Sequence, residues 1–486
     1  MALFARLLRN FVFDTAAPRV RWSRCVSRNT STFNVCVVGS GPAGFYTAYK
    51  LLKDNPDVKV DIYEKLPVPF GLVRYGVAPD HPDVKNVINQ FTELAHSGRC
   101  TFVGNISIGT QLTVDDLKHY YNAIVMAYGA KEERKLGIPG EDLPGVYSAR
   151  AFVGWYNGLP EEKNLHPDLS GERAVIFGQG NVAVDVARIL LTPVELLKNT
   201  DICAHALNTL AQSKIRRVDI VGRRGPLQVA FTIKELRELT KLPGCFPSLD
   251  PSDFDGIQPK LSGKVPRPRK RITELMINAA NKEIINTEGL KEWTLTFLRS
   301  PVELLSSTDG TVSSVKLEKN RIEDRNGVPC AIGTGEMETR DCDVVFCSIG
   351  YKGVPVDNSV PFDSDKGIIP NKDGRVLNNE GEHIPGLYCS GWVKRGPTGV
   401  IVNTMNDAFA TAHLILMDFN DGKLPVAEYS GEATKKLLPS IKGLDPITFS
   451  QWEKIDHLEQ QRGNELGKPR EKVISVEEMV TVATTE

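Results

Sequence analysis

Two stretches of the chain share one order of apolar and polar positions. Residues 34–41 form an apolar run that ends in glycines, PAGFYTAYKLLK follows with apolar residues at helical spacing, and VKVDIYEK is a second apolar run. ERAVIFGQG, NVAVDVARILL and RRVDIVGRRG repeat this order from residue 172 onward. An apolar run, a period of 3.6 residues and another apolar run predict a strand, a helix and a parallel strand. We therefore expect two βαβ units.

Glycines mark the first strand-to-helix turn, GSGPAG. Gly39 permits a tight turn, Gly41 lets the backbone approach a pyrophosphate, and Gly44 lets the helix pack closely on the strand. The helix N-terminus offers free N–H groups to phosphates. Glu64 ends the second strand, where an acid accepts hydrogen bonds from ribose hydroxyls. This unit predicts a site for FAD or NAD.

The second turn, with Gly178, Gly180 and Ala183, is followed by a strand that ends in Arg223 and Arg224. An acid at this place repels a 2′-phosphate, whereas two guanidinium groups bind one in fork geometry. The second unit therefore predicts an NADP site. The alternative for the arginine pair is a solvated strand end.

The segments around these units indicate how the domains are connected. AIVMAYGA is a strand that leaves the first unit, and DVVFCSIGYKG is a strand that returns to it. A later strand, glycine turn and long helix carry no third nucleotide motif. We expect an α/β protein with two Rossmann-like domains, the NADP domain inserted in a discontinuous FAD domain. The predicted boundaries are 1–33 for a leader, 34–136 and 358–486 for the FAD domain, and 137–357 for the NADP domain.

Composition excludes several classes of protein. Of 486 residues, 41% are hydrophobic and 24% are charged, which is typical of a folded globular chain. With 59 basic and 60 acidic residues the net charge is −1, so bulk charge attracts neither nucleic acid nor membrane. The apolar runs are shorter than the roughly 18–20 residues that span a bilayer. We expect no nucleic-acid partner and at most peripheral membrane association.

The first 33 residues are rich in arginine and contain a single acid, Asp14. Leu3, Phe4, Leu7 and Leu8 form an apolar stripe at helical spacing. This pattern predicts a mitochondrial transit peptide, and the alternative is a disordered arm.

Nine cysteines form neither a CxxC pair nor a cluster with histidine. A zinc or iron–sulfur site is therefore not expected. Cys342 and Cys347 have the spacing of a redox disulfide, but residues five apart in a strand point to opposite faces. We interpret both as small buried residues.

Several motifs occur together and in order: VVGSGPAGFYTA, PVPFGLVRYGVAPDHP, GQGNVAVDVARILL, VGRRGPLQVAFTIKELRE, VPRPRKR and GLYCSGWVKRGPTGVI. With them the chain resembles, from about residue 34 to about 475, the mitochondrial NADPH:adrenodoxin oxidoreductases. The resemblance implies a flavoprotein enzyme, similar in fold to glutathione reductase but without its redox disulfide. It also implies electron transfer from NADPH through FAD to an acidic, adrenodoxin-like [2Fe–2S] ferredoxin in the mitochondrial matrix, feeding cytochromes and steroid or iron–sulfur pathways. FAD suits this task because it accepts two electrons and releases them singly.

The resemblance further implies which residues contact the cofactors. The flavin contacts are Ala43, Glu64, Leu72, Ile108, Trp392, Gly399, Val400 and Ile401. The NADP contacts are Gln179, Gly180, Asn181, Val182, Arg223, Arg224, Glu235 and again Gly399. Trp392 stands where many flavoproteins have an aspartate, which narrows the resemblance to this family. At Ile108 the contact is expected from the backbone.

His81, in APDHP, is by itself most simply a loop histidine bonded to a carbonyl. The resemblance implies a catalytic role for it, paired with Asp185. No covalent catalyst is expected.

Four basic residues lie close together in VPRPRKR: Arg267, Arg269, Lys270 and Arg271. Alone, they indicate a solvated loop or a flank ahead of a helix. The resemblance implies that they dock the acidic ferredoxin.

Two other functions fit parts of the sequence. One is a subunit like that of glutamate synthase, although its cysteine-rich iron–sulfur segments are missing from the sequence. The other is an NADP-binding redox sensor with a vestigial flavin site. A flavin absorption band in the purified protein separates the enzyme from the sensor.

Overall fold

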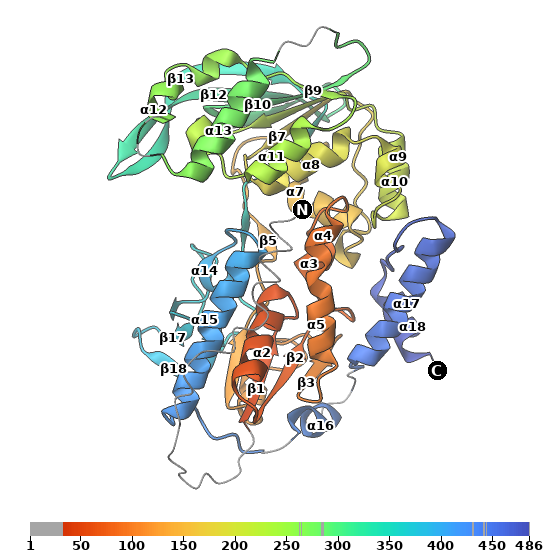
Figure 1. Cartoon of the computed structure of the whole chain (residues 1–486), viewed down its shortest axis with the longest axis vertical. Coiled ribbons are helices and arrows are strands. Elements are labelled where there is room, and N and C mark those ends of the chain that lie inside the picture. Colours follow the sequence, from red (N-terminus) through yellow and green to blue (C-terminus); the bar gives the residue numbers. More distant parts are fainter. Residues whose placement is uncertain are drawn as a thin grey trace, which may run out of the picture.

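The computed structural model describes residues 33–485 except 262, 264, 283–285, 430, 431, 441, 442 and 444. Almost all of the predicted leader, residues 1–33, therefore lies outside the described residues. Figure 1 shows two α/β lobes stacked along the long axis, with the N-terminal and C-terminal segments of the chain together in one lobe and the middle of the chain in the other.

The first lobe is built on a seven-stranded sheet with the order β16-β17-β18-β4-β1-β2-β3. Strands β3, β2, β1, β4 and β18 are parallel to their neighbours, and β16 and β17 continue antiparallel. The strands are β1 (Phe33–Val38), β2 (Val58–Tyr63), β3 (Cys100–Val103), β4 (Ala123–Met126), β16 (Asn371–Lys372), β17 (Arg375–Leu377) and β18 (His383–Cys389). Both ends of the chain thus supply one sheet.

Helices of this first lobe also come from both ends of the chain. The long helix α15 packs on α2, because each buries an apolar face against the sheet. The helices are α2 (Pro42–Asp54), α3 (Leu72–Tyr75), α4 (Pro82–Lys85), α5 (Val87–Ala95), α6 (Val114–Lys118), α14 (Trp392–Arg395), α15 (Ile401–Asn420), α16 (Ala433–Leu437), α17 (Phe449–Glu465) and α18 (Val476–Thr484).

The second lobe has a six-stranded parallel sheet with the order β6-β14-β7-β8-β10-β9. Its strands are β6 (Val146–Ser148), β7 (Arg173–Phe177), β8 (Arg217–Val221), β9 (Cys245–Pro247), β10 (Lys291–Thr296) and β14 (Val344–Cys347). Its helices are α7 (Ala149–Tyr156), α8 (Asn181–Leu191), α9 (Val194–Leu197), α10 (Ala204–Ala211), α11 (Ile233–Thr240), α12 (Ile257–Leu261) and α13 (Arg267–Ala280). An antiparallel sheet of β11 (Arg299–Ser306), β12 (Val312–Arg325) and β13 (Val328–Asp341) covers one face.

The chain passes between the lobes twice. The two crossings pair as a short ribbon of β5 (Glu132–Glu133) and β15 (Tyr351–Lys352). This arrangement confirms the predicted fold class, two dinucleotide-binding folds with one inserted in the other. The residue boundaries of the domains stay a prediction.

The eight cysteines among the described residues are all free. Cys342, just ahead of β14, has no exposed surface, whereas Cys347 at its end is only partly buried. The expectation that both are buried therefore holds fully for Cys342 alone.

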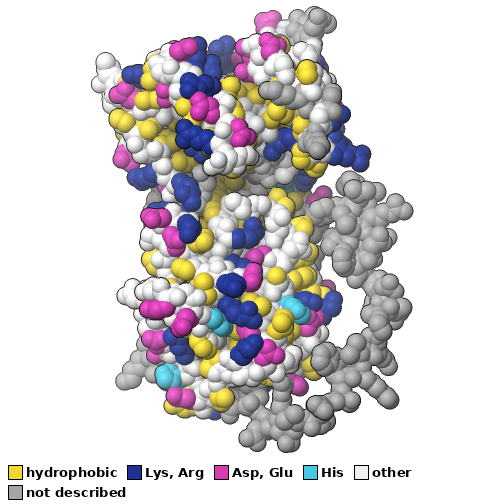
Figure 2. Space-filling model, turned by 90° about the vertical axis from the view of Figure 1, so that its left-hand side faces the viewer, with side chains coloured by type: hydrophobic (Ala, Val, Ile, Leu, Met, Phe, Trp, Pro, Cys, Tyr) yellow, Lys and Arg dark blue, Asp and Glu magenta, His cyan; other side chains and the backbone are white. Residues whose placement is uncertain are grey.

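Positive and negative side chains are intermixed on the face drawn in Figure 2, where the two lobes meet at an indentation. Among the described helices, none combines the length and the apolar character that crossing a bilayer requires.

Candidate functional site

The first glycine turn lies between β1 and α2. Gly39 has φ +106°, and a Cβ on it would lie 2.7 Å from the Tyr128 Cα, so this position requires glycine. A Cβ on Gly44 would overlap the carbonyl oxygen of Gly39. A Cβ on Gly41, by contrast, would meet no atom within 4 Å. Gly41 therefore faces open space at a helix N-terminus without a side-chain cap, which fits a pyrophosphate.

Glu64 lies beside this turn and is oriented by it. Its Oε2 accepts hydrogen bonds from the Ser40 backbone N–H at 3.0 Å and hydroxyl at 2.7 Å, and its Oε1 accepts one from the Leu66 N–H at 3.3 Å. The carboxylate is thus fixed at the end of β2 with lone pairs left for a ribose.

A loop from the same lobe approaches the turn. The Phe70 N–H donates to the Ser40 carbonyl at 3.1 Å, and a Cβ on Gly71 would lie 3.0 Å from the Gly41 Cα. Leu72 starts α3 directly after this contact and is 42% exposed. Ile108 lies elsewhere, buried in an apolar cluster with Ile106 and Leu112, which leaves only its backbone for a ligand.

The C-terminal part of the first lobe completes the site. A Cβ on Gly391 would lie 2.5 Å from the Ala43 Cβ, so the turn before α14 touches the first turn of α2. Trp392 follows at the start of α14, and its ring stacks on Tyr351 with centroids 5.7 Å apart. Gly399, with φ +84°, leads into α15. The structure therefore brings most of the predicted flavin contacts to one edge of the first sheet.

The second glycine turn lies between β7 and α8. Gly178 has φ +119°, and a Cβ on it would overlap the Ser348 carbonyl, whereas a Cβ on Gly180 would meet nothing within 4 Å. The helix starts at Asn181 without a side-chain cap. The pattern is that of the first turn, and it again leaves room for a pyrophosphate.

A loop covers the second turn. The Gln179 carbonyl accepts from Ala230 N–H at 2.8 Å and Phe231 N–H at 3.1 Å, and Asn181 Oδ1 accepts from Thr232 N–H at 2.8 Å. Gln179 also donates to the Thr296 carbonyl at 3.1 Å. Of the predicted NADP contacts, Gln179 and Asn181 thus position the loop as well as the helix start.

Arg223 and Arg224 are both exposed beside this loop. Their backbone carbonyls are held by Asn320 and Leu298, at 3.0 and 3.2 Å. Neither guanidinium group makes a hydrogen bond or ion pair with another described residue. Both are therefore available for a 2′-phosphate.

His81 and two glutamates meet where the lobes touch. The His81 Nε2 lies 2.6 Å from Glu238 Oε2 and 3.7 Å from Glu235 Oε2. His81 comes from the first lobe, at the start of α4, and both glutamates lie on α11 of the second. One imidazole nitrogen and two carboxylate oxygens this close together could bind a metal ion. The Arg188 guanidinium, 3.3 Å from Glu235, already places a positive charge there.

Arg188 links this contact to the predicted catalytic pair. It is 3% exposed and bonds to Asp185 at 2.8 Å, to Glu235 at 3.3 Å and to Asp80, with its Nη2 at 3.0 Å. His81 and Asp185 are therefore joined through Arg188 and its partners, without a hydrogen bond between them. Glu235 faces Arg188 and His81.

Burial and charge hold a proton in this cluster near neutral pH. Burial, reinforced by the Asp185 carboxylate, raises the pKa of Glu235 to about 7. Burial alone would lower the pKa of His81, but the hydrogen bond to Glu238 and the charges of Asp80 and Glu235 outweigh it and raise that pKa. Such perturbed groups at a domain contact are candidates for functional proton chemistry.

The basic run lies on α13. The expectation that these cations precede the helix is wrong, because α13 begins at Arg267 with a proline in its first turn, where proline loses no helical hydrogen bond. Arg267, Lys270 and Arg271 are exposed. Arg269 instead points inward and donates to the Val229 carbonyl at 2.6 Å. The four charges thus divide into three at the surface and one that holds the loop over the NADP turn.

Sequence reasoning missed Arg188, Asp80 and Glu238. All three are charged residues inside segments interpreted as nucleotide-binding helices or loops, and no local pattern marks Asp80 or Glu238. A charged position on the buried face of α8, Arg188, was the one available signal.

The chain is similar to known proteins over most of its length. A family profile described as pyridine nucleotide-disulphide oxidoreductase matches residues 33–220. The chain is 56% identical over 461 residues to a human protein named NADPH:adrenodoxin oxidoreductase, mitochondrial, covering 93% of this chain and 92% of that one. A Drosophila melanogaster protein of the same name is 46% identical over 462 residues, covering 94% and 95%.

A solved structure is also similar over nearly the whole chain. Mycobacterium tuberculosis FprA in complex with NADPH superposes with a TM-score of 0.87 at 40% identity, covering 93% of this chain and all of that one.

Proposed function

The chain belongs to the family of mitochondrial NADPH:adrenodoxin oxidoreductases, and from this we propose that it transfers electrons from NADPH through FAD to an adrenodoxin-type [2Fe–2S] ferredoxin. It is an oxidoreductase, and its cofactors are FAD and NADP(H). The ferredoxin in turn reduces mitochondrial cytochromes, in steroid metabolism, or serves iron–sulfur assembly.

One observation supports this proposal: the β-strands that end beside the two glycine turns carry side chains of opposite charge at their ends. The first ends in the fixed carboxylate of Glu64, which favours ribose hydroxyls and repels a 2′-phosphate. The second ends in Arg223 and Arg224, two exposed guanidinium groups without an acidic partner among the described residues. A chain with both sites accepts one dinucleotide without and one with a 2′-phosphate.

Bound FAD would supply the conversion between a two-electron hydride donor, NADPH, and a one-electron acceptor such as a ferredoxin. The residues of this chain bind and orient the two dinucleotides. Gly41 and the start of α2 would hold the flavin pyrophosphate, and Trp392 and Leu72 would contact the flavin. Gly180 and the start of α8 take the NADPH pyrophosphate.

We assign to the cluster around His81 the role of holding one proton. The raised pKa values of His81 and Glu235 support this, as does their place at the contact of the two lobes. Asp185 acts on this cluster through its hydrogen bond with Arg188 and through its own charge, which helps to raise the pKa of Glu235. The roles of His81 and Asp185 are thus to hold a proton and to orient its neighbours.

The partner surface is the exposed part of the α13 basic run. Arg267 and Arg271 are solvent-exposed and form no ion pair with another described residue, so they are free to attract an acidic ferredoxin. Attraction of opposite charges speeds encounter and weakens as salt approaches about 0.15 M, where the screening length is about 8 Å.

The test replaces both arginines, Arg267→Glu with Arg271→Glu. We expect ferredoxin-dependent cytochrome c reduction to fall at least about tenfold at low salt, because two attractive charges become repulsive. NADPH–ferricyanide activity should stay within about twofold, since ferricyanide does not need the docking surface. Initial rates with each acceptor measure both.

Arg269→Gln is the matched control on the same helix turn. Because Arg269 holds the loop over the NADP turn, this variant should raise the KM for NADPH with both acceptors. An unchanged ferredoxin rate in the double variant would remove α13 from the docking surface. A purified protein without a flavin absorption band would contradict the enzymatic function itself.

We place the protein in the mitochondrial matrix, at most peripherally associated with the inner membrane. The arginine-rich first 33 residues support import, and the relatives are named mitochondrial.

A further inference from the structure

A short segment near the C-terminus lies between the two lobes. Residues 467–474 lie in the connection between α17 and α18, and in Figure 1 this connection lies next to α10 of the second lobe. We call it the C-terminal strap. Two of its lysines, Lys468 and Lys472, are 6% and 3% exposed. Burying an ammonium group costs free energy unless the group has a hydrogen-bonding or charged partner. Both lysines therefore need defined partners in the folded protein.

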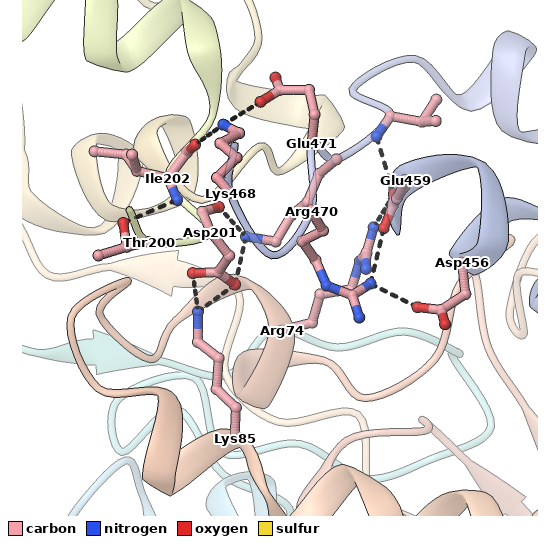
Figure 3. A network of polar contacts seen from close by, with 12 residues as sticks. Arg74, Lys85, Thr200, Asp201, Ile202, Asp456, Glu459, Lys468, Arg470 and Glu471 are labelled. Carbon is pink, nitrogen blue, oxygen red and sulfur yellow. Dashed lines mark hydrogen bonds and ion pairs between the residues drawn. The ribbon is translucent and has the colours of Figure 1, made fainter. Parts of the chain in front are cut away.

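The strap binds the second lobe through side chains. The Lys472 ammonium lies 3.1 Å from Asp201 Oδ2 and donates to the Asp201 carbonyl at 3.1 Å. Lys468 donates to the Ile202 carbonyl. The Glu471 carboxylate accepts from the Ala204 N–H at 3.0 Å. Figure 3 shows the lysine contacts converging on the loop before α10.

Glu471 also acts as the missing cap of a helix. Ala204 is the first residue of α10, and Cys203 at the N-cap position provides no side-chain hydrogen bond. A carboxylate at this end satisfies a free N–H group and interacts favourably with the helix dipole. A residue of the C-terminal segment therefore completes a helix of the inserted lobe.

The strap also contacts the rest of the first lobe. Glu459 on α17 has no exposed surface, accepts from the Val473 N–H at 2.9 Å and pairs with Arg74 on α3. Its backbone carbonyl accepts from the Glu471 N–H at 2.8 Å. Arg470 adds a contact to Glu459 at 3.2 Å (Figure 3). The strap is thus tied to the helix that begins at the flavin-site residue Leu72.

Asp201 receives a second cation from the first lobe. The Lys85 ammonium on α4 lies 2.6 Å from its carboxylate. Burial, together with the neighbouring Lys472, lowers the pKa of Lys85 to about 8. One carboxylate of the second lobe therefore lies between two ammonium groups of the first.

We propose that the C-terminal strap holds the two lobes in a fixed relative position. Lys472 and Glu471 are positioning residues in it, and they set how the nicotinamide approaches the flavin. The inference rests on the proposed function. The strap holds the loop that follows α8 and α9 on one side and α3 on the other, and α8 begins at the NADP turn. Hydride transfer requires a short, defined distance between the two rings. Contacts that fix both elements therefore affect the transfer step more than the binding of either cofactor.

The test uses the full-length holoenzyme with Lys472→Met and Glu471→Gln combined. Anaerobic stopped-flow absorbance follows flavin reduction by NADPH without ferredoxin. We expect the rate at saturating NADPH to fall at least about tenfold, while FAD content and the half-saturating NADPH concentration stay within about threefold. Hydrogen exchange of the Ala204 amide should accelerate, since the neutral amide oxygen of glutamine is a weaker acceptor than the carboxylate and does not favour the helix dipole.

Lys454→Met on α17 is the matched control, because this lysine is exposed and, among the described residues, donates to the Thr485 carbonyl alone. Lys472→Arg should restore most of the rate by keeping a charge toward Asp201. If the double variant loses FAD, Glu471→Gln alone is measured by the same two methods. A flavin reduction rate within twofold of wild type in a variant with faster Ala204 exchange would overturn the proposal. Since no ferredoxin is present, this outcome is distinct from a failure of wild-type enzyme to reduce ferredoxin.

Discussion

At the scale of single residues, Arg223 and Arg224 determine the choice of coenzyme. Replacing both with glutamine removes charge-assisted hydrogen bonds to the 2′-phosphate, each contributing roughly 1.5–3 kcal/mol. We expect the ratio of kcat/KM for NADPH over NADH to fall at least about tenfold, mainly through loss of NADPH efficiency. Steady-state rates with ferricyanide at varied coenzyme measure this ratio.

The matched control is Arg325→Gln, which neutralises an exposed arginine at the end of β12. It should leave the coenzyme ratio unchanged. If the double variant keeps the wild-type preference for NADPH, the 2′-phosphate is bound elsewhere.

At the scale of elements, the turn between β1 and α2 contains one glycine that is needed for cofactor binding and another that is needed for folding. Gly41→Val adds a side chain that meets no protein atom within 4 Å, at a φ of −73° that valine accepts. The variant should fold but purify without FAD, because the new side chain fills the place of the pyrophosphate. Absorbance at the flavin band and circular dichroism measure the two properties.

Gly39→Val tests the other half of that distinction. At φ +106° and 2.7 Å from the Tyr128 Cα, a side chain strains the backbone and clashes, so this variant should not fold stably. Stoichiometric FAD in purified Gly41→Val protein would contradict the assignment of the turn.

Elements whose geometry depends on nearby residues were predictable from the sequence. The glycine turns and the strand ends at Glu64 and Arg223 follow from backbone constraints within a few residues. The start of α13 was not predicted correctly, because proline and cations suggest a loop although proline is compatible with a first turn. The inward side chain of Arg269 depends on Val229, 40 residues away, and no local pattern records that contact.

At the scale of the whole molecule, the contact between the lobes is sensitive to pH. The pKa of Glu235 is about 7 in the folded protein against an ordinary 4.5. Below pH 4.5 both states are protonated. As pH rises toward 7, the Glu235 carboxyl of the unfolded chain loses its proton before that of the folded protein. The free energy of unfolding therefore falls by roughly 2–3 kcal/mol. The raised pKa of His81 acts in the same direction.

Glu235→Gln should therefore flatten the fall in Tm between about pH 5 and pH 8. Thermal unfolding of the holoenzyme without NADPH, followed by flavin fluorescence at several pH values, measures this slope. Glu274→Gln, a partly exposed position on α13 away from this contact, is the control and should keep the wild-type slope. Equal slopes in Glu235→Gln and wild type would show that Glu235 does not titrate at this contact.

The arrangement of the lobes was predicted in outline and not in detail. The motif order indicates an insertion, because the third strand–turn–helix segment has no nucleotide motif. The partners across the contact, such as Arg188 with Asp80 and Lys472 with Asp201, are residues 108 and 271 positions apart. Periodicity and turn chemistry act over short distances along the chain, so they carry no information about such pairs.

The discontinuous first sheet also dictates an order of events during biosynthesis. Strand β4 can pair with β1 as soon as both are made, but its other neighbour, β18, is synthesised much later. The turn at Gly391, which contacts Ala43, is also synthesised late. A ribosome must therefore add more than 250 residues between these partners, and the inserted lobe can become compact first. Until the last third of the polypeptide is released, an unpaired sheet edge stays open to chaperones and to aggregation. Flavin capture is thus a late step, because it requires residues near 391–401 as well as those of the first turn.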